Sequence, residues 1–424
     1  MLSIPRELLE EVLRRTDLAA LVGAHVQLKK SGKALRGLCP FHQEKTGSFT
    51  VEGERWRCYG CQANGDAIAF LQKTAGLSFL EATRQLAAAA GVSLPSRNEK
   101  PAPVDPLTRA LQLAQAHFVE SLASPEGAPA RDYLASRGLS AETVSRFGIG
   151  WAPASWSSLS NRLAKEGLIP AARTLGLAVA RKQSGGHYDF LRDRLTFPLR
   201  APSGQLLAFA GRLLGPSDAP KFLCTQESPR FRKSATLFGA DVARSAFRLR
   251  RTAVLVEGYF DCAVLQHAGV AHTAALCGTA LSPEHLELLR ASGVEELVLL
   301  LDGDAAGSAA VARLAPLLLP SGFVTRVALL PAGDDPDVFV LREGPDALSA
   351  LLAQASSLSQ HFLAHLLPGG PAASFNAKLS ARKQLADVLA PLPSGFWKSA
   401  FLAEAARHFG VSEDELLPGN PSAR

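Results

Sequence analysis

Short apolar runs alternate with helix-like segments in the second half of the chain. Three runs of mostly aliphatic residues, typical of strands buried on both faces of a sheet, occupy 253–256, 297–301 and 324–330. The intervening stretches have helical spacing and predict helices at 260–268, 282–292 and 305–318. This alternation predicts a parallel α/β sheet with helices covering both of its faces.

Acidic residues follow each of the three predicted strands. They are Glu257 and Asp261, Asp302 and Asp304, and Asp335 and Asp337. Ligands of parallel α/β sheets bind at the carboxyl ends of the strands, so we expect these carboxylates to share one crevice. Carboxylates that lie close together repel each other unless cations separate them. The pattern therefore predicts a site for two or more Mg²⁺ or Mn²⁺ ions, which suits phosphoryl transfer.

Ordinary turn chemistry is the competing interpretation of these acids, because Asp beside Gly or Pro is common in loops. It would explain one cluster, but three clusters at successive strand ends favour the metal site. In that site we expect Glu257, Asp302 and Asp304 to be catalytic. Glu257 is either a further metal ligand or a proton acceptor, and the sequence does not choose between these roles.

Two pairs of metal-ligand residues occur near the amino terminus, in Cys39-Pro40-Phe41-His42 and Cys58-Tyr59-Gly60-Cys61. Each pair has the two-residue gap of a tight metal-binding turn. Three thiolates and one imidazole, from Cys39, His42, Cys58 and Cys61, suit one tetrahedral Zn²⁺. Because this set is complete, no position is left for a catalytic water, and we predict a structural zinc ribbon.

Aromatic and basic side chains are interleaved around the predicted zinc ligands. Cations beside exposed rings bind single-stranded nucleic acid, since the cations contact phosphates while the rings stack on bases. We expect Trp56 and its neighbouring Lys and Arg residues to make such contacts. Phe41 and Phe49 are instead expected to form the core of the ribbon.

Three arginines of the middle segment have apolar, strand-like surroundings. Arg192 and Arg194 lie in the segment 190–198, and Arg212 ends the segment 207–212. An unpaired cation in such surroundings is costly, so each is expected to have a phosphate or carboxylate partner.

The length of the 424-residue chain and the changes in composition along it indicate several domains. Its 45 Lys and Arg residues outnumber 39 Asp and Glu, and the net charge of +6 indicates a polyanionic partner for the segments outside the acidic one. A helical pattern at 67–90 is followed by a proline-rich stretch. We predict a multidomain α/β (α+β) protein with a zinc ribbon (1–95), a linker (96–106), a basic mixed α+β subdomain (107–240), a metal-binding parallel α/β subdomain (241–345) and a helical subdomain (346–424).

The start lacks a secretory signal, and no apolar run reaches the roughly 20 residues of a membrane span, so we expect a cytoplasmic protein without a membrane partner.

Seven motifs, in order along nearly the whole chain, resemble those of bacterial DnaG-type DNA primases. They are the zinc-ligand pairs extended to Gln43-Glu44-Lys45-Thr46, Arg192-Asp193-Arg194 with Phe197-Pro198, Gly211-Arg212 with Pro220-Lys221-Phe222, Val256-Glu257-Gly258-Tyr259-Phe260-Asp261, Gly278-Thr279-Ala280, Asp302-Gly303-Asp304 and Asp335-Pro336-Asp337. The resemblance implies an RNA-polymerase core built around a Toprim fold, which joins ribonucleoside triphosphates into short primers on single-stranded DNA. It also implies metal or catalytic roles for the six acids, and template or nucleotide contacts for Arg192, Arg194, Arg212, Lys221 and Lys233.

The sequence departs from the family pattern in several places. Gly47 replaces a proline of the zinc module, Ala305 replaces an arginine after the Asp302 motif, and Cys224 begins a replaced motif. Family members usually carry a further helical domain that docks on the replicative helicase. Either that part is missing from this chain or the helicase, an expected partner, is engaged differently. We expect a monomer that acts at the replication fork.

Two rival functions belong to other classes. A Toprim nuclease or topoisomerase would break strands, but a type IA topoisomerase needs a catalytic tyrosine outside the metal motif, and only Tyr133 and Tyr188 lie outside the motifs. A recombination mediator with zinc and Toprim modules would bind DNA without catalysis, but such proteins are much shorter and need no basic middle segment.

Overall fold

The computed structural model describes residues 4, 6–32, 34–44, 46–92, 104–182, 185–215, 218–301 and 305–417. The contacts of the chain form two units, Met1–Pro103 and Val104–Arg424. Most of the predicted linker and the predicted metal ligands Asp302 and Asp304 lie outside the described residues. Within the described part of the chain, no helix is long and apolar enough to cross a membrane.

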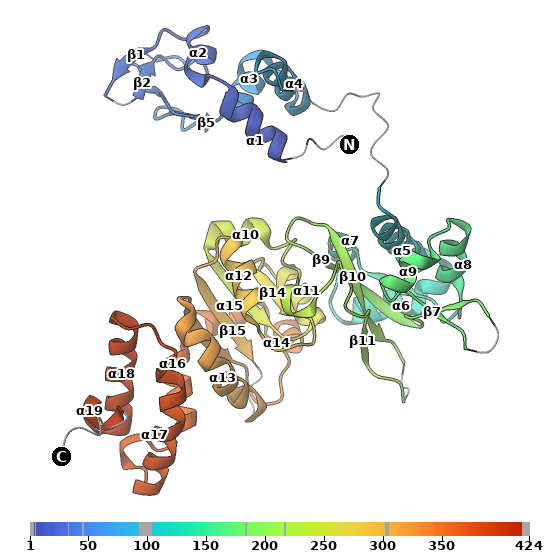
Figure 1. The fold of residues 1–424 in the computed structure, drawn as a ribbon, viewed down its shortest axis with the longest axis vertical. Helices are drawn as coiled ribbons and strands as arrows, with labels where there is room; N and C mark the ends of the chain where they lie inside the picture. The colour runs from blue at the N-terminus through green and yellow to red at the C-terminus, as the bar shows by residue number, and fades with distance from the viewer. Residues whose placement is uncertain are drawn as a thin grey trace. The chain divides into compact units, whose positions relative to one another are not determined.

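The first unit is a five-stranded antiparallel sheet flanked by helices (Figure 1). Its elements are α1 (Arg6–Arg15), α2 (Leu18–Gly23), β1 (Lys29–Ser31), β2 (Ala34–Gly37), β3 (Phe49–Glu52), β4 (Arg55–Cys58), β5 (Asn64–Gly65), α3 (Ala67–Ala75) and α4 (Phe79–Ala89). Burial alternates along β4, so Arg55 and Arg57 are exposed while Trp56 and Cys58 point into the core. This period of two is what a strand with one buried face requires.

The helical stretch predicted at 67–90 is broken in two. Gly76 ends α3 with a φ of 65°, a left-handed conformation that glycine adopts without a steric penalty. Ser78 then begins α4, because its hydroxyl accepts a hydrogen bond from the Glu81 amide while the Glu81 carboxylate accepts one from the Ser78 amide. The predicted helical stretch is therefore confirmed as two helices rather than one.

The second unit begins with helices that pack on a small antiparallel sheet of order β11-β10-β9-β6. The helices are α5 (Pro106–Ala123), α6 (Ala128–Ser136), α7 (Ala141–Phe147), α8 (Ser158–Lys165) and α9 (Ile169–Thr174). The sheet contains β6 (Gly150–Ala152), β9 (Arg194–Arg200), β10 (Leu206–Leu213) and β11 (Phe222–Cys224), and a separate hairpin joins β7 (Ala178–Ala180) to β8 (His187–Asp189). Strands β9 and β10 pair antiparallel, which places Arg194 opposite Leu213.

A six-stranded sheet of order β12-β14-β13-β15-β16-β17 follows. Its strands are β12 (Leu237–Phe238), β13 (Thr252–Val256), β14 (Thr273–Leu276), β15 (Glu296–Leu301), β16 (Val324–Leu329) and β17 (Ser356–Ser357). The four central strands are parallel, and β13, β15 and β16 confirm the predicted strands. The sequence did not predict the short antiparallel strands β12 and β17 that close the two edges.

Helices cover both faces of this sheet, as predicted. The helices are α10 (Arg244–Arg250), α11 (Tyr259–His267), α12 (Pro283–Ala291), α13 (Ala305–Leu318), α14 (Pro336–Glu343) and α15 (Pro345–Ala353). Val254 and Val298 face the core that contains residues of α11, α14 and α15. Leu255 and Leu299, next in sequence, face the core formed with α10, α12 and α13. Strands buried on both faces therefore read as continuous aliphatic runs.

The remaining helices pack on this α/β layer, as expected of a helical C-terminal subdomain (Figure 1). They are α16 (Leu358–Leu366), α17 (Phe375–Leu389), α18 (Phe396–Phe409) and α19 (Glu413–Leu416). Ala315 of α13 lies in the same buried cluster as Leu385 and Phe401 of these helices. The two sheets of the second unit also share a core, in which the ring of Phe197 stacks on that of Tyr259 at 5.3 Å.

Candidate metal and catalytic sites

The four predicted zinc ligands converge in the first unit. Their ligand atoms all lie within 4.8 Å of one another. The Sγ atoms of Cys39 and Cys61 are 3.9 Å apart, and Nδ1 of His42 is 3.8 Å from Sγ of Cys58. Such separations are those between ligands of a single tetrahedral Zn²⁺ with bonds of about 2.0–2.3 Å. The residues present therefore fit the predicted zinc ion.

The two buried zinc-site thiols have different acidities. Burial raises the pKa of Cys39 to about 12. Burial opposes ionisation of Cys58 too, but hydrogen bonds led by the one with the Ser48 hydroxyl outweigh it and lower the pKa of Cys58 to about 7. The Ser48 oxygen lies 3.1 Å from the Cys58 sulfur. One ligand is thus poised to be a thiolate at neutral pH, which is the form that binds zinc.

Glu44 organises the zinc site, although the sequence did not single it out. Its Oε1 accepts the amide N–H groups of Cys39, at 2.8 Å, and Ser48, at 2.9 Å. Its Oε2 accepts the Ser48 hydroxyl and lies 3.3 Å from Nε2 of His42. A carboxylate on one ring nitrogen leaves the other nitrogen for the metal, so Glu44 directs Nδ1 of His42 toward the thiols. The sequence signal that could have identified Glu44 is its position two residues after the zinc ligand His42.

The prediction that Trp56 contacts nucleic acid is wrong. Trp56 is 1% exposed, its ring stacks on Phe49 at 5.2 Å, and its indole N–H donates to the carbonyl of Asp66. It is core, like the fully buried Phe49, which was predicted correctly. The exposed ring is Tyr59, which is 57% exposed and lies under the guanidinium of Arg57. Every second residue of β4 is buried, which places Trp56 in the core, whereas Tyr59 follows the strand and is exposed.

The described members of the predicted acid set lie together at one edge of the six-stranded sheet. Glu257, Asp261 and Asp335 line a cavity of about 330 Å³ together with Leu300, near the end of β15. Glu257 and Asp335 are exposed, whereas Asp261 is partly buried. Its Oδ2 accepts the amide of Gly258 at 3.1 Å, and its Oδ1 accepts the amide of Asp337 at 3.3 Å. The acids that follow β13 and β16 therefore share a crevice, as predicted.

Negative charge in this cavity is incompletely balanced. Burial raises the pKa of Asp261 to about 7, and repulsion from Asp337 and Asp335 adds to this effect. Asp337 is fully buried behind the cavity, where its Oδ2 accepts a hydrogen bond from Arg137 while its Oδ1 has no hydrogen-bond partner. Oxygen donors in excess of local cations fit a divalent metal ion.

Three cations, Arg137, Arg212 and Lys221, line the same cavity. The guanidinium of Arg212 lies 5.1–5.4 Å from the ring centres of Tyr133, Phe222 and Phe260. Arg137 lies 5.2 Å from the same Phe260 ring. Cation–π contacts restrict both side chains. Arg137 comes from the turn after α6, 200 residues before its partner Asp337, and no sequence pattern indicated the pair.

The other predicted basic residues lie outside this cavity. Arg194 is 3% exposed and donates to the carbonyls of Gly211, Pro220 and Lys221, so its partners are backbone oxygens rather than the expected phosphate or carboxylate. Lys233 lies in the helical turn η2 (Lys233–Ala235), where its carbonyl oxygen is 2.9 Å from Nε2 of His285.

Arg192 lies over two exposed or half-exposed rings. Its guanidinium is 4.2 Å from the ring centre of Trp156, which is 59% exposed, and 5.2 Å from that of Tyr188. Trp156 was missed in the sequence, although it stands among small polar residues that could not bury it. Trp156, like Tyr59, is therefore an exposed aromatic beside a cation, whereas Trp56 is not.

Three family profiles match consecutive parts of the chain. Their descriptions are CHC2 zinc finger for residues 4–102, DNA primase catalytic core, N-terminal domain for residues 117–244, and Toprim-like for residues 254–340. A DNA primase of Myxococcus xanthus is 46% identical over 415 residues, which cover 96% of this chain and 68% of the relative. The chain belongs to the DnaG-type DNA primases. It is a DNA-directed RNA polymerase that synthesises RNA primers, as the resemblance implied.

Further relatives and solved structures of primases agree. The DNA primases of Pseudomonas aeruginosa and Escherichia coli (strain K12) are 38% and 33% identical, and the matches cover 92% and 98% of this primase and 60% and 73% of the relatives. The crystal structure of the Aquifex aeolicus primase, with zinc binding and RNA polymerase domains, has a TM-score of 0.65 at 28% identity, covering 97% of this chain and 98% of that one. A structure of the DnaG primase catalytic domain bound to ssDNA has a TM-score of 0.64 at 29% identity, covering 71% and 97%.

Proposed function

We propose that this primase joins ribonucleotides on a single-stranded DNA template in the cavity of Glu257, Asp261 and Asp335. The observation that carries the proposal is the shared lining: acids from the ends of two parallel strands and three cations face the same space. Asp302 and Asp304 follow β15, which lies between those two strands. We include both in the site on the basis of their sequence position.

Divalent cations bound by these acids would neutralise the triphosphate and lower the pKa of the attacking hydroxyl. The chain's own cations supply a second function. Arg212, held by three rings, and the exposed Lys221 can bind the triphosphate of the incoming ribonucleotide. The primer 3′-hydroxyl then attacks the α-phosphorus, the bond to the β-phosphate oxygen breaks, and pyrophosphate leaves. Because three rings already restrict the Arg212 side chain, it loses little conformational entropy when the nucleotide binds.

Arg137 and Asp337 have a positioning role in this proposal. Asp337 is completely buried, and it supports the cavity from behind because its backbone N–H donates a hydrogen bond to Oδ1 of Asp261. Arg137 neutralises Asp337 and thereby limits the repulsion that Asp261 experiences. Removing Arg137 would leave a buried, unpaired carboxylate, which is a costly arrangement.

We propose that Arg192, Trp156 and Tyr188 contact the template strand. Stacking on an exposed ring and a cation beside it suit a flexible single strand whose bases are unpaired. The relative bound to single-stranded DNA supports this choice of partner. Arg194, in contrast, is assigned to holding the β10–β11 connection.

The test is incorporation of labelled ribonucleotides on single-stranded DNA with Mg²⁺ or Mn²⁺. Glu257→Gln and Asp302→Ala should each lower the rate by about a hundredfold or more, the scale reported for loss of one group that stabilises transition-state charge. Glu287→Gln, an exposed acid on α12, is the matched control and should leave the rate unchanged. Full activity of Glu257→Gln would place the chemistry elsewhere.

A further inference from the structure

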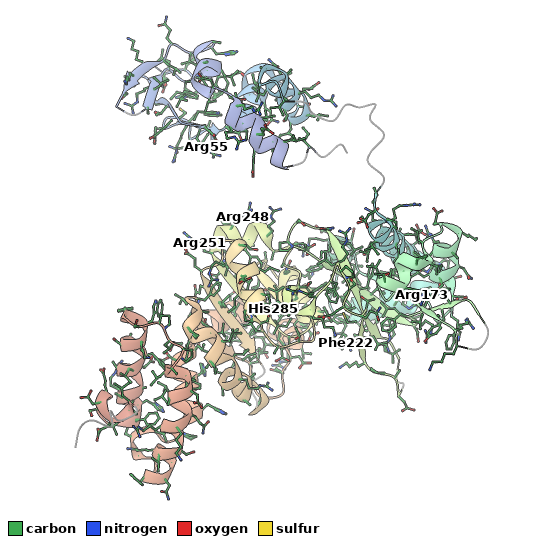
Figure 2. The ribbon with its side chains drawn as sticks, viewed as in Figure 1. Arg55, Arg173, Phe222, Arg248, Arg251 and His285 are labelled. Carbon is green, nitrogen blue, oxygen red and sulfur yellow. The ribbon has the colours of Figure 1, made fainter. Side chains whose placement is uncertain are left out.

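A basic surface lies on the second unit away from the acids of the cavity. It consists of Arg244, Arg248, Arg250 and Arg251, on or directly after α10, and is called the α10 arginine surface below. Arg248, Arg250 and Arg251 are exposed, and Leu249 between them is 86% exposed. Figure 2 shows Arg248 and Arg251 on the outside of this helix. The segment 244–251 contains four arginines and no acid.

Ion pairing accounts for only one of these arginines. Arg251 pairs with Glu295, but no ion pair of Arg244, Arg248 or Arg250 occurs among the described residues. Cations in the last turn of a helix are stabilised by its dipole, by about 0.3–1 kcal/mol, which suits Arg248 and Arg250. The same dipole disfavours Arg244 in the first turn. Helix stability and ion pairing therefore do not account for all four arginines, since neither explains Arg244.

A cavity of about 480 Å³ adjoins this surface. Arg250, Thr252, His272, Arg326 and Ser349 supply its polar lining. Nδ1 of His272 is buried and has no hydrogen-bond partner. Burial lowers the pKa of His272 to about 4, and the charge of Arg250 adds to this effect. An anion beside Arg250 would balance its charge, and rotation of the His272 ring would bring Nδ1 to the same anion.

The acids around the cavity do not neutralise Arg250. Glu296 is engaged by Arg326 and by the hydroxyl of Thr252. Asp346, which lines the cavity, is exposed on α15 and forms no ion pair among the described residues. The cavity therefore retains a cation and a ring nitrogen without partners.

The cavity lies at the opposite end of the sheet from the polymerising site. Thr252 begins β13 and Arg326 lies near the start of β16, whereas Glu257 and Asp335 follow the ends of these strands. The five residues of β13 span roughly 16 Å at about 3.3 Å per residue. The two sites are therefore distinct, and one nucleotide cannot occupy both.

We propose that the α10 arginine surface and this cavity bind the phosphodiester backbone of single-stranded DNA, with one phosphate between Arg250 and His272. A free phosphate compound would occupy the cavity alone. Arg244 and Arg248 are four residues apart, so they lie on one face of α10, about 6 Å apart along its axis at about 1.5 Å per residue. These two cations and Arg250, which lines the cavity at the end of the helix, offer contacts to successive phosphates of one strand. The proposal depends on DNA as the partner and not on the location of the chemistry.

The experiment measures binding of fluorescent oligo(dT) by anisotropy over a range of salt concentrations, with the complete chain. The double variant Arg248→Glu, Arg250→Glu should weaken binding at least tenfold at low salt. It should also reduce the slope of log K against log salt by about 1.4, since each phosphate contact on a single strand contributes about 0.7. The variant Lys398→Glu, Arg407→Glu on α18 makes the same change of net charge and should leave the slope unchanged.

A second readout is specific to the cavity. The ring resonance of His272, assigned by its absence in His272→Gln, should shift when oligo(dT) is added. Arg248→Gln with Arg250→Gln, a milder pair, should weaken binding in the same direction, and circular dichroism verifies that each variant is folded.

An unchanged salt slope in the folded variants, or an equal loss in the α18 control, overturns the proposal. So does a His272 shift produced by inorganic phosphate but not by oligo(dT). Because binding is measured without ribonucleotides, failure of the polymerising site would not affect these results.

Discussion

Trp56 and Tyr59 lie three residues apart and have opposite environments. Trp56 is 1% exposed within the aromatic core of the zinc-binding unit, whereas Tyr59 is 57% exposed. We expect Trp56→Ala to lower the unfolding free energy of this unit by about 3–5 kcal/mol, because it leaves a large cavity. Tyr59→Ala should change it by less than about 0.5 kcal/mol, as is usual at the surface. Denaturant unfolding followed in the isotopically labelled first unit distinguishes them, and equal effects would contradict the assignment of the core.

Arg192 and Arg194 form a second pair of close neighbours with different roles. Arg194→Met should destabilise the second unit by about 2–4 kcal/mol, since carbonyl oxygens in a buried site lose their donors. Arg192→Met should leave stability nearly unchanged but weaken single-stranded DNA binding several-fold, because it removes a cation beside Trp156. Thermal unfolding and anisotropy, measured on both variants, separate the roles. A stable Arg194→Met with reduced DNA binding would reverse them.

At the scale of elements, buried parallel strands were the most predictable feature. Runs such as Leu297 to Leu301 must be apolar at every position, because successive residues face two different helical layers. The two-residue edge strands β12 and β17 carry no such signal. The pairing of Arg137 with Asp337 depends on how two distant helices meet, so local sequence could not reveal it. The zinc ligands were predictable since their chemistry fixes their spacing.

The break between α3 and α4 depends on local capping that a helical pattern conceals. Ser78→Ala should lower stability by about 1 kcal/mol, because the amide of Glu81 loses its acceptor at the start of α4. Ser78→Asp keeps an acceptor and should retain most of that stability. Denaturant unfolding of the two variants gives the comparison. If Ser78→Ala proves as stable as the unchanged chain, the turn is held by Gly76 and packing alone.

At the scale of the whole molecule, the chain consists of two units with separate cores. The first unit includes the four zinc ligands, and the second includes Glu257, Asp261 and Asp335, which line one cavity. The buried core of each unit is made of residues of that unit alone. Their stabilities are therefore expected to respond separately to metal removal.

Removal of zinc tests this independence. A chelator should abolish hydrogen-exchange protection in β3, β4 and the ligand turns, because the cluster of Cys39, His42, Cys58 and Cys61 then lacks the bonds that hold these turns together. Protection in β13, β15 and β16 should remain, since their cores contain no zinc ligand. Cys61→Ser, which removes an exposed ligand, should reproduce the chelator effect, whereas Cys224→Ser in the second unit should not. Loss of protection in both units on chelation would show that they fold as one cooperative body.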